Sequence, residues 1–134
     1  NTKLTTIQGL ETWDTSKVTN MSNMFLYCQK LKSADVSKFI TSKVTSMRSM
    51  FSSCKELTTL DVSGFKTGNV TTMLQMFLNC NNLVTVDISN FDLSSVTDIS
   101  NLFLKKIYPS GKFPSLAIVI SLKDSFFASI LIIS

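Results

Sequence analysis

Hydrophobic and polar residues follow one another along this chain in a pattern that repeats every 26 residues. The phrase V-T-x-M-x-x-M-F occurs three times and is followed by a softened copy, V-T-x-I-x-x-L-F. The copies begin at Val18, Val44, Val70 and Val96. A cysteine follows each of the first three copies at a constant distance, at Cys28, Cys54 and Cys80. A period of this length is typical of proteins built from stacked repeats.

The spacing inside one repeat predicts a short helix and then a short strand. In the third copy, four apolar residues fall at i, i+3, i+4 and i+7, the pattern of one helix face: Met73, Met76, Phe77 and Cys80. Val86-Asp87-Ile88 then alternates between apolar and polar, which is typical of a half-buried strand. Aromatic rings recur in register and are expected in the core, at Trp13, Phe39, Phe65 and Phe91.

Stacking these units predicts the fold class: an α/β, right-handed, leucine-rich-repeat-like solenoid with one short helix and one short parallel strand per repeat. One such unit cannot bury its apolar face alone, so neighbouring copies must form the core together. Parallel strands lie roughly 4.8 Å apart, whereas packed helices need about 8–10 Å. We therefore expect the stack to curve, with the strands on its inner side.

The repeat pattern divides the chain into two segments. Residues 1–103 form the predicted repeat region, an N-terminal half-repeat followed by about three and a half repeats. Residues 104–134 depart from the pattern, since Lys106 replaces the cysteine and Pro109 the following leucine. We predict a last strand at Leu116–Ser121 and a short terminal helix, which together would cap the core. The alternatives are a truncated or decayed end, or a surface completed by further sequence.

Charge and composition narrow the range of partners. The net charge is +4, and most of the excess lies in residues 104–134. Nucleic-acid binding favours a basic stripe that contains arginines. Arg48 is the one arginine of the chain, so we expect no nucleic-acid binding. No signal peptide is visible at the start. The apolar stretch Leu116–Ser134 is interrupted by Lys123 and Asp124, so we interpret it as globular, and membrane association would need an anchor not seen here.

The chain lacks the residues on which common catalytic chemistry depends. It has no histidine, which is the commonest general base, and none of the usual phosphate-loop, zinc or nucleophile-elbow motifs. We therefore predict no enzyme, no cofactor and no metal site. The three cysteines recur one repeat apart, so each should lie on a different helix of the stack. Neighbouring helices about 8–10 Å apart would hold their Cα atoms beyond the roughly 7 Å limit for a disulfide. We expect them to be buried free thiols.

The polar residue at the centre of each predicted strand is an aspartate, and the three aspartates should form a column on the outer face. Three functions fit such a column: recognition of basic or polar ligand groups, capture of a calcium ion, or binding of a partner protein. The structural alternative is that each carboxylate accepts hydrogen bonds from the backbone of the following turn. The column and its polar neighbours make up the candidate binding face, which consists of Asp35, Ser37, Lys38, Asp61, Ser63, Lys66, Asp87 and Ser89.

The segment W-D-T-S-K-V-T-N-M-S-N-M-F-L-Y-C, at Trp13–Cys28, closely resembles the repeat of BspA-like leucine-rich-repeat surface proteins. Later copies also match, so the resemblance covers residues 4–103. It implies an extracellular or cell-surface protein that binds a protein or glycan on another cell or in the matrix, with no catalytic residues.

Two functional hypotheses follow. The first is a surface-exposed repeat module for adhesion, which binds its ligand through the strand face. The second is a structural spacer, or a fragment of a longer repeat array, without a ligand of its own.

Overall fold

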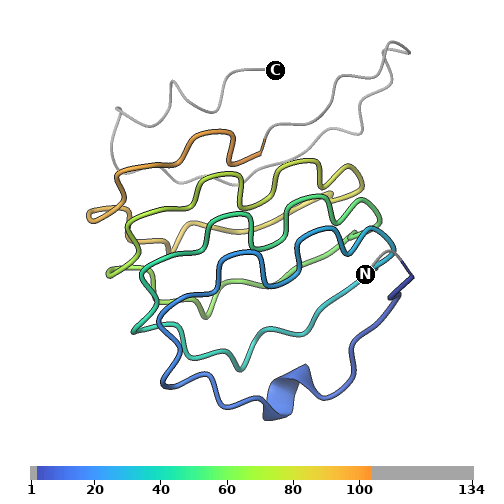
Figure 1. The fold of residues 1–134 in the computed structure, drawn as a ribbon, viewed down its shortest axis with the longest axis horizontal. Helices are drawn as coiled ribbons and strands as arrows, with labels where there is room; N and C mark the ends of the chain where they lie inside the picture. Colours follow the sequence, from blue (N-terminus) through green and yellow to red (C-terminus); the bar gives the residue numbers. More distant parts are fainter. Residues whose placement is uncertain (1–2, 104–134) are drawn as a thin grey trace.

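In a computed structural model, which describes residues 3–103, the chain winds through a series of coils that lie side by side (Figure 1). Each coil has a zigzag run followed by a straighter return run. The zigzag runs cover residues 20–28, 46–54, 72–80 and 98–103, and the return runs centre on residues 31–36, 57–62 and 83–88. A 3-10 helix, η1 (Leu10–Thr12), precedes the first zigzag run, and Gly9 before it has a left-handed φ of 80°.

The predicted α/β solenoid, with one helix and one strand per repeat, is wrong. Within residues 3–103, η1 is the only helix, and β-structure is limited to isolated bridge residues, with four parallel bridges joining two described residues each. The bridges join Asn20 to Ser46, Ser46 to Thr72, Thr72 to Asp98, and Thr59 to Thr85. No bridge extends into a sheet in this part of the chain, which consists mostly of turns and coil.

Turns take the place of the predicted helices, because two residues in each of the first three zigzag runs have a left-handed backbone conformation. In the first zigzag run, Asn23 and Tyr27 have φ of 62° and 59°. An α-helix needs a negative φ at every residue, and the left-handed conformation costs an L-residue about 1–2 kcal/mol. The same two positions are left-handed in the next two runs, at Ser49, Ser53, Gln75 and Asn79. The apolar residues still point inward, but successive turns place them there.

Hydrogen bonds between neighbouring copies account for this conformation. The N–H groups of Met21, Asn23, Phe25 and Tyr27 donate to carbonyls of the next zigzag run, over N···O distances of 2.8 to 2.9 Å. Intervening N–H groups donate locally instead, as from Cys28 to Phe25 at 3.1 Å. Every second N–H group is thus aimed at the neighbouring copy, which a helix would not allow because its N–H groups bond four residues back.

The return runs, where strands were predicted, pair much less. Thr59↔Thr85 is the bridge that joins two of their described residues, and the N–H groups of Thr58 and Val84 reach the preceding copy over 3.2 and 3.3 Å. Strand pairing needs neighbouring chains roughly 4.8 Å apart. Because the zigzag runs are not helices, they approach closely enough to pair, and three of the four bridges lie there.

The core runs continuously between the two kinds of run. It contains the predicted cysteines and most of the predicted methionines and phenylalanines, with Met47, Met50, Met73 and Met76 fully enclosed, whereas Phe91 is only partly buried against it. Phe25, Phe51, Phe77 and Phe103 stack with ring centroids 5.1 to 5.9 Å apart and nearly parallel planes. Trp13 was expected in the core, but it is 47% exposed, because it stacks on Phe39 with no ring on its other side.

Three buried threonines hold neighbouring coils together. The Thr41 hydroxyl accepts a hydrogen bond from the N–H of Lys66 at 2.7 Å and donates to the Lys66 carbonyl at 3.0 Å. Thr15 does the same with Ile40, and Thr67 with Asp92. A single hydroxyl thus satisfies two backbone groups of the next coil, which would otherwise be costly to bury.

Some sequence predictions fall beyond this part of the structure. The proposed last strand, the terminal helix and the capping role of residues 104–134 lie outside the described residues. Within residues 3–103, no helix has the length and apolar character needed to cross a membrane.

Candidate binding face

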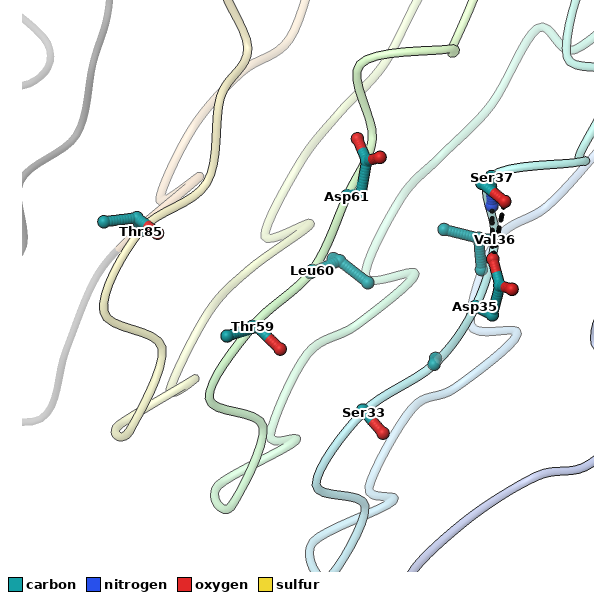
Figure 2. A pocket seen from close by; sticks show the side chains of 9 residues that line it. Ser33, Asp35, Val36, Ser37, Thr59, Leu60, Asp61 and Thr85 are labelled. Carbon is teal, nitrogen blue, oxygen red and sulfur yellow. Dashed lines mark hydrogen bonds between the residues drawn. The ribbon is translucent and has the colours of Figure 1, made fainter.

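The eight residues of the candidate binding face lie on the return runs and the turns that follow them, and all eight are exposed. Asp35, Ser37 and Asp61 line an open groove of about 470 Å³ that crosses neighbouring return runs (Figure 2). Ser63, Asp87, Ser89 and the two lysines lie outside the lining of this groove.

Each aspartate of the column is held by the turn that follows it. One carboxylate oxygen of Asp35 accepts hydrogen bonds from the N–H of Ser37 at 3.1 Å and from its hydroxyl at 2.6 Å. Asp61 accepts the corresponding bonds from Ser63 at 2.9 and 2.6 Å. Asp87 accepts from the N–H of Ser89 at 2.8 Å. The predicted hydrogen bonding of these carboxylates to their own turns is confirmed.

These hydrogen bonds favour the ionised carboxylates. The hydroxyl and N–H of the following serine lower the pKa of Asp35, Asp61 and Asp87. The charge of Asp61 acts weakly in the opposite direction on both of its neighbours. The column is therefore negatively charged at neutral pH, and its members lie close enough to influence one another.

The two lysines add positive charge beside the column. Lys38 follows Ser37, and its charge makes a small further contribution to the lowered pKa of Asp35, after that of the serine. The backbone N–H of Lys66 is bound to Thr41, while its side chain is exposed. Within residues 3–103 the one ion pair is Lys30–Glu56, so neither lysine is engaged in one.

The groove also contains hydroxyl groups that the sequence analysis did not select. Ser33, Thr59 and Thr85 line it, each two positions before an aspartate of the column. Figure 2 shows Thr59 and Asp61 on one run and Ser33 and Asp35 on its neighbour. Their signal in the sequence is a hydroxyl residue at the same place in each repeat, which alternation alone assigns to the outward side.

The remaining chemical groups are poorly placed for reaction. Cys28, Cys54 and Cys80 are buried and form no disulfide with one another, as the sequence predicts. The thiols of Cys54 and Cys80 lie 3.2 and 3.1 Å from the carbonyls of Phe25 and Phe51. Burial raises the pKa of the Cys54 thiol, which disfavours the reactive thiolate. Residues 3–103 contain no group of three or more metal-ligating side chains placed to hold an ion.

A family model described as Mycoplasma protein of unknown function, DUF285, matches residues 1–110, which include all of the repeats. No curated protein and no solved structure matches the chain.

Proposed function

This chain belongs to the family described as Mycoplasma protein of unknown function, DUF285, and we propose that it is a non-enzymatic binding module. Its ligand is a protein or glycan on another cell or in the extracellular matrix, held by the candidate binding face. The observation that carries this proposal is the row of exposed, ionised carboxylates at Asp35, Asp61 and Asp87. The resemblance of the repeat to BspA-like surface proteins supports display outside the cell.

The chemistry of the face suits a polar ligand with positive or hydroxyl groups. The carboxylates accept hydrogen bonds, the hydroxyls of Ser33 and Thr59 can donate or accept, and the lysines donate. Charge-assisted hydrogen bonds are stronger than neutral ones. Because the serines already hold the carboxylates of Asp35 and Asp61 in place, less conformational freedom is lost when a ligand binds.

The proposal can be tested by removing charge while keeping the turns. In Asp61→Asn/Asp87→Asn, the amide oxygen can still accept from the following N–H group, so the backbone should be preserved. Binding of the purified chain to immobilised matrix glycoproteins and to a glycan array would be measured at several salt concentrations. We expect the double variant to bind about tenfold more weakly and to depend less on salt.

Asp92→Asn is the matched control. Asp92 accepts a hydrogen bond from the N–H of Ser94 at 2.9 Å, in the same kind of turn, but it is not part of the aspartate column or of the candidate binding face. This variant should bind as the unchanged chain does. Unchanged binding by Asp61→Asn/Asp87→Asn would contradict the proposal.

A structural spacer is the second candidate. It is favoured by the recurrence of the same turn at Asp14, Asp92 and Asp98, outside the candidate face, which shows that the motif also serves the backbone. If Asp61→Ala and Asp87→Ala reduce stability but leave ligand binding intact, the aspartates are structural.

A further inference from the structure

A second groove, of about 460 Å³, lies over three successive zigzag runs, away from the candidate binding face. Its lining combines an aromatic ring, a guanidinium and several amides and hydroxyls, including Tyr27, Arg48, Ser52, Gln75 and Asn79. Arg48 is the one charged residue in this lining, and no carboxylate lines it. The groove therefore suits a polar ligand that is neutral or negatively charged.

Three serine hydroxyls in this groove lack hydrogen-bond partners among residues 3–103. Ser49, Ser52 and Ser53 are only 5%, 4% and 6% exposed, yet all three line the groove. Their side chains form no hydrogen bond with this part of the protein, and their oxygens retain contact with the surface. The three hydroxyls are therefore available to hydrogen-bond with a polar ligand in the groove.

Tyr27 is the residue that the fold explains least. Its position is left-handed in each of the three zigzag runs, and Ser53 and Asn79 occupy it in the others. Asparagine tolerates this conformation, whereas a bulky residue there is a genuine outlier. Tyr27 gains little from burial, because it is 56% exposed. Its ring is thus held at the groove in an unfavourable conformation without a compensating role in the core.

Arg48 is the one arginine of the chain and supplies the positive charge of the groove. The corresponding residues of the other copies are Ser22, Leu74 and Ser100, so the repeat does not require a cation here. Arg48 is exposed and forms no ion pair within residues 3–103, while the nearby Asp98 is bound to the N–H of Ser100. Its guanidinium is free to bind a carboxylate in a two-pronged fashion.

We propose that this groove binds an acidic saccharide. The Tyr27 ring would stack on the face of a sugar, Arg48 would bind the carboxylate, and the three serines with Gln75 and Asn79 would bind hydroxyl groups. A dense set of groups that both donate and accept hydrogen bonds matches a polyol better than an acidic peptide. This site is independent of the aspartate column and does not rest on the function proposed above.

The test is calorimetric titration of the chain with acidic saccharides and their neutral counterparts. Trigalacturonate is compared with its methyl ester, and sialyllactose with lactose. We expect at least one acid to bind about tenfold more tightly than its neutral counterpart, because the carboxylate pairs with Arg48. Arg48→Ser, which restores the residue of the first copy, should abolish that preference.

Two further variants separate binding from folding. Tyr27→Asn introduces the residue of the third copy, so it should weaken saccharide binding about tenfold while leaving the melting temperature unchanged or raising it. Ser52→Ala removes a hydroxyl that stabilises nothing within the described residues, so it should weaken binding without loss of stability. Asp61→Asn should bind the saccharide normally, which distinguishes this site from the candidate binding face.

Three outcomes would overturn the inference. The first is failure of both acidic saccharides to bind at millimolar concentration. The second is tighter binding of hexaglutamate, which would assign the groove to an acidic peptide instead. The third is a Tyr27→Asn variant that melts at a lower temperature but binds normally, which would make the ring structural.

Discussion

At the scale of single residues, the same side chain serves the backbone and a surface at once. The carboxylate of Asp61 accepts two hydrogen bonds from Ser63, yet it remains exposed beside the groove. Thr41 does similar work in the interior, where its hydroxyl satisfies both backbone groups of Lys66. Hydroxyl and carboxylate groups thus complete the hydrogen bonding of a chain that has little regular secondary structure.

The aspartate turns predict how stability depends on pH. Hydrogen bonds lower the folded-state pKa of Asp35, Asp61 and Asp87. Their contribution is therefore fully present above the unfolded pKa of about 3.9 and is lost as the pH falls through the folded values. In urea denaturation between pH 6 and pH 2, the triple Asp→Asn variant should lose less stability on acidification than the unchanged chain. Equal losses would show that these turns do not contribute.

At the scale of elements, the zigzag run takes the place of the predicted helix. It has the same apolar spacing, but its backbone turns at two left-handed residues and directs alternate N–H groups to the next copy. The left-handed conformation is unfavourable in isolation, but it directs backbone N–H groups to carbonyl acceptors of the neighbouring copy. The ladder of hydrogen bonds between copies therefore depends on conformations that no single repeat would favour.

Glycine substitution distinguishes this conformation from a helix. Gln75 has φ of 59°, so Gln75→Gly removes a left-handed cost of about 1–2 kcal/mol. The added freedom of the unfolded chain offsets about 0.5–1 kcal/mol of this gain. We expect unchanged or slightly higher stability in thermal denaturation. Arg48→Gly, at a position outside the left-handed set, should instead destabilise the chain. A loss at both positions would point to a helix.

At the scale of the whole molecule, stability comes from contacts between neighbouring copies. The phenylalanine stack and the enclosed methionines make one continuous core, and each coil contributes only part of it. Such proteins behave approximately as a sum of repeat stabilities and neighbour interfaces. A residue in a central coil has a neighbour on both sides, so its loss affects two interfaces.

The position of a ring in the stack should therefore decide the cost of removing it. Phe51 lies between Phe25 and Phe77 and is fully buried, so Phe51→Ala should lower the free energy of unfolding by about 3–5 kcal/mol. Trp13→Ala should cost much less, because the ring is half exposed and stacks on one side only. Urea denaturation measures both, and similar losses would contradict a continuous core.

The sequence alone determined how the copies correspond and most of the residues that are inside, with Trp13 as an exception. The apolar spacing correctly predicts the burial of Met73, Met76, Phe77 and Cys80, because burial depends on side-chain chemistry and register rather than on the path of the backbone. It also predicts that the aspartates are exposed and bonded to their own turns, since those contacts are local in sequence. The second groove has no such local signal, because Tyr27, Arg48 and Asn79 come from three different copies.

Only the tertiary structure decided the backbone conformation. A spacing of i, i+3, i+4 and i+7 fits a helix, but it equally fits two successive turns, and the choice depends on where alternate N–H groups find acceptors. Those acceptors belong to the next copy, as in the bond from Phe25 to Met50 at 2.8 Å. Local sequence propensity does not register a hydrogen bond between residues that are 25 positions apart. The zigzag conformation is therefore stable only when neighbouring coils are in place.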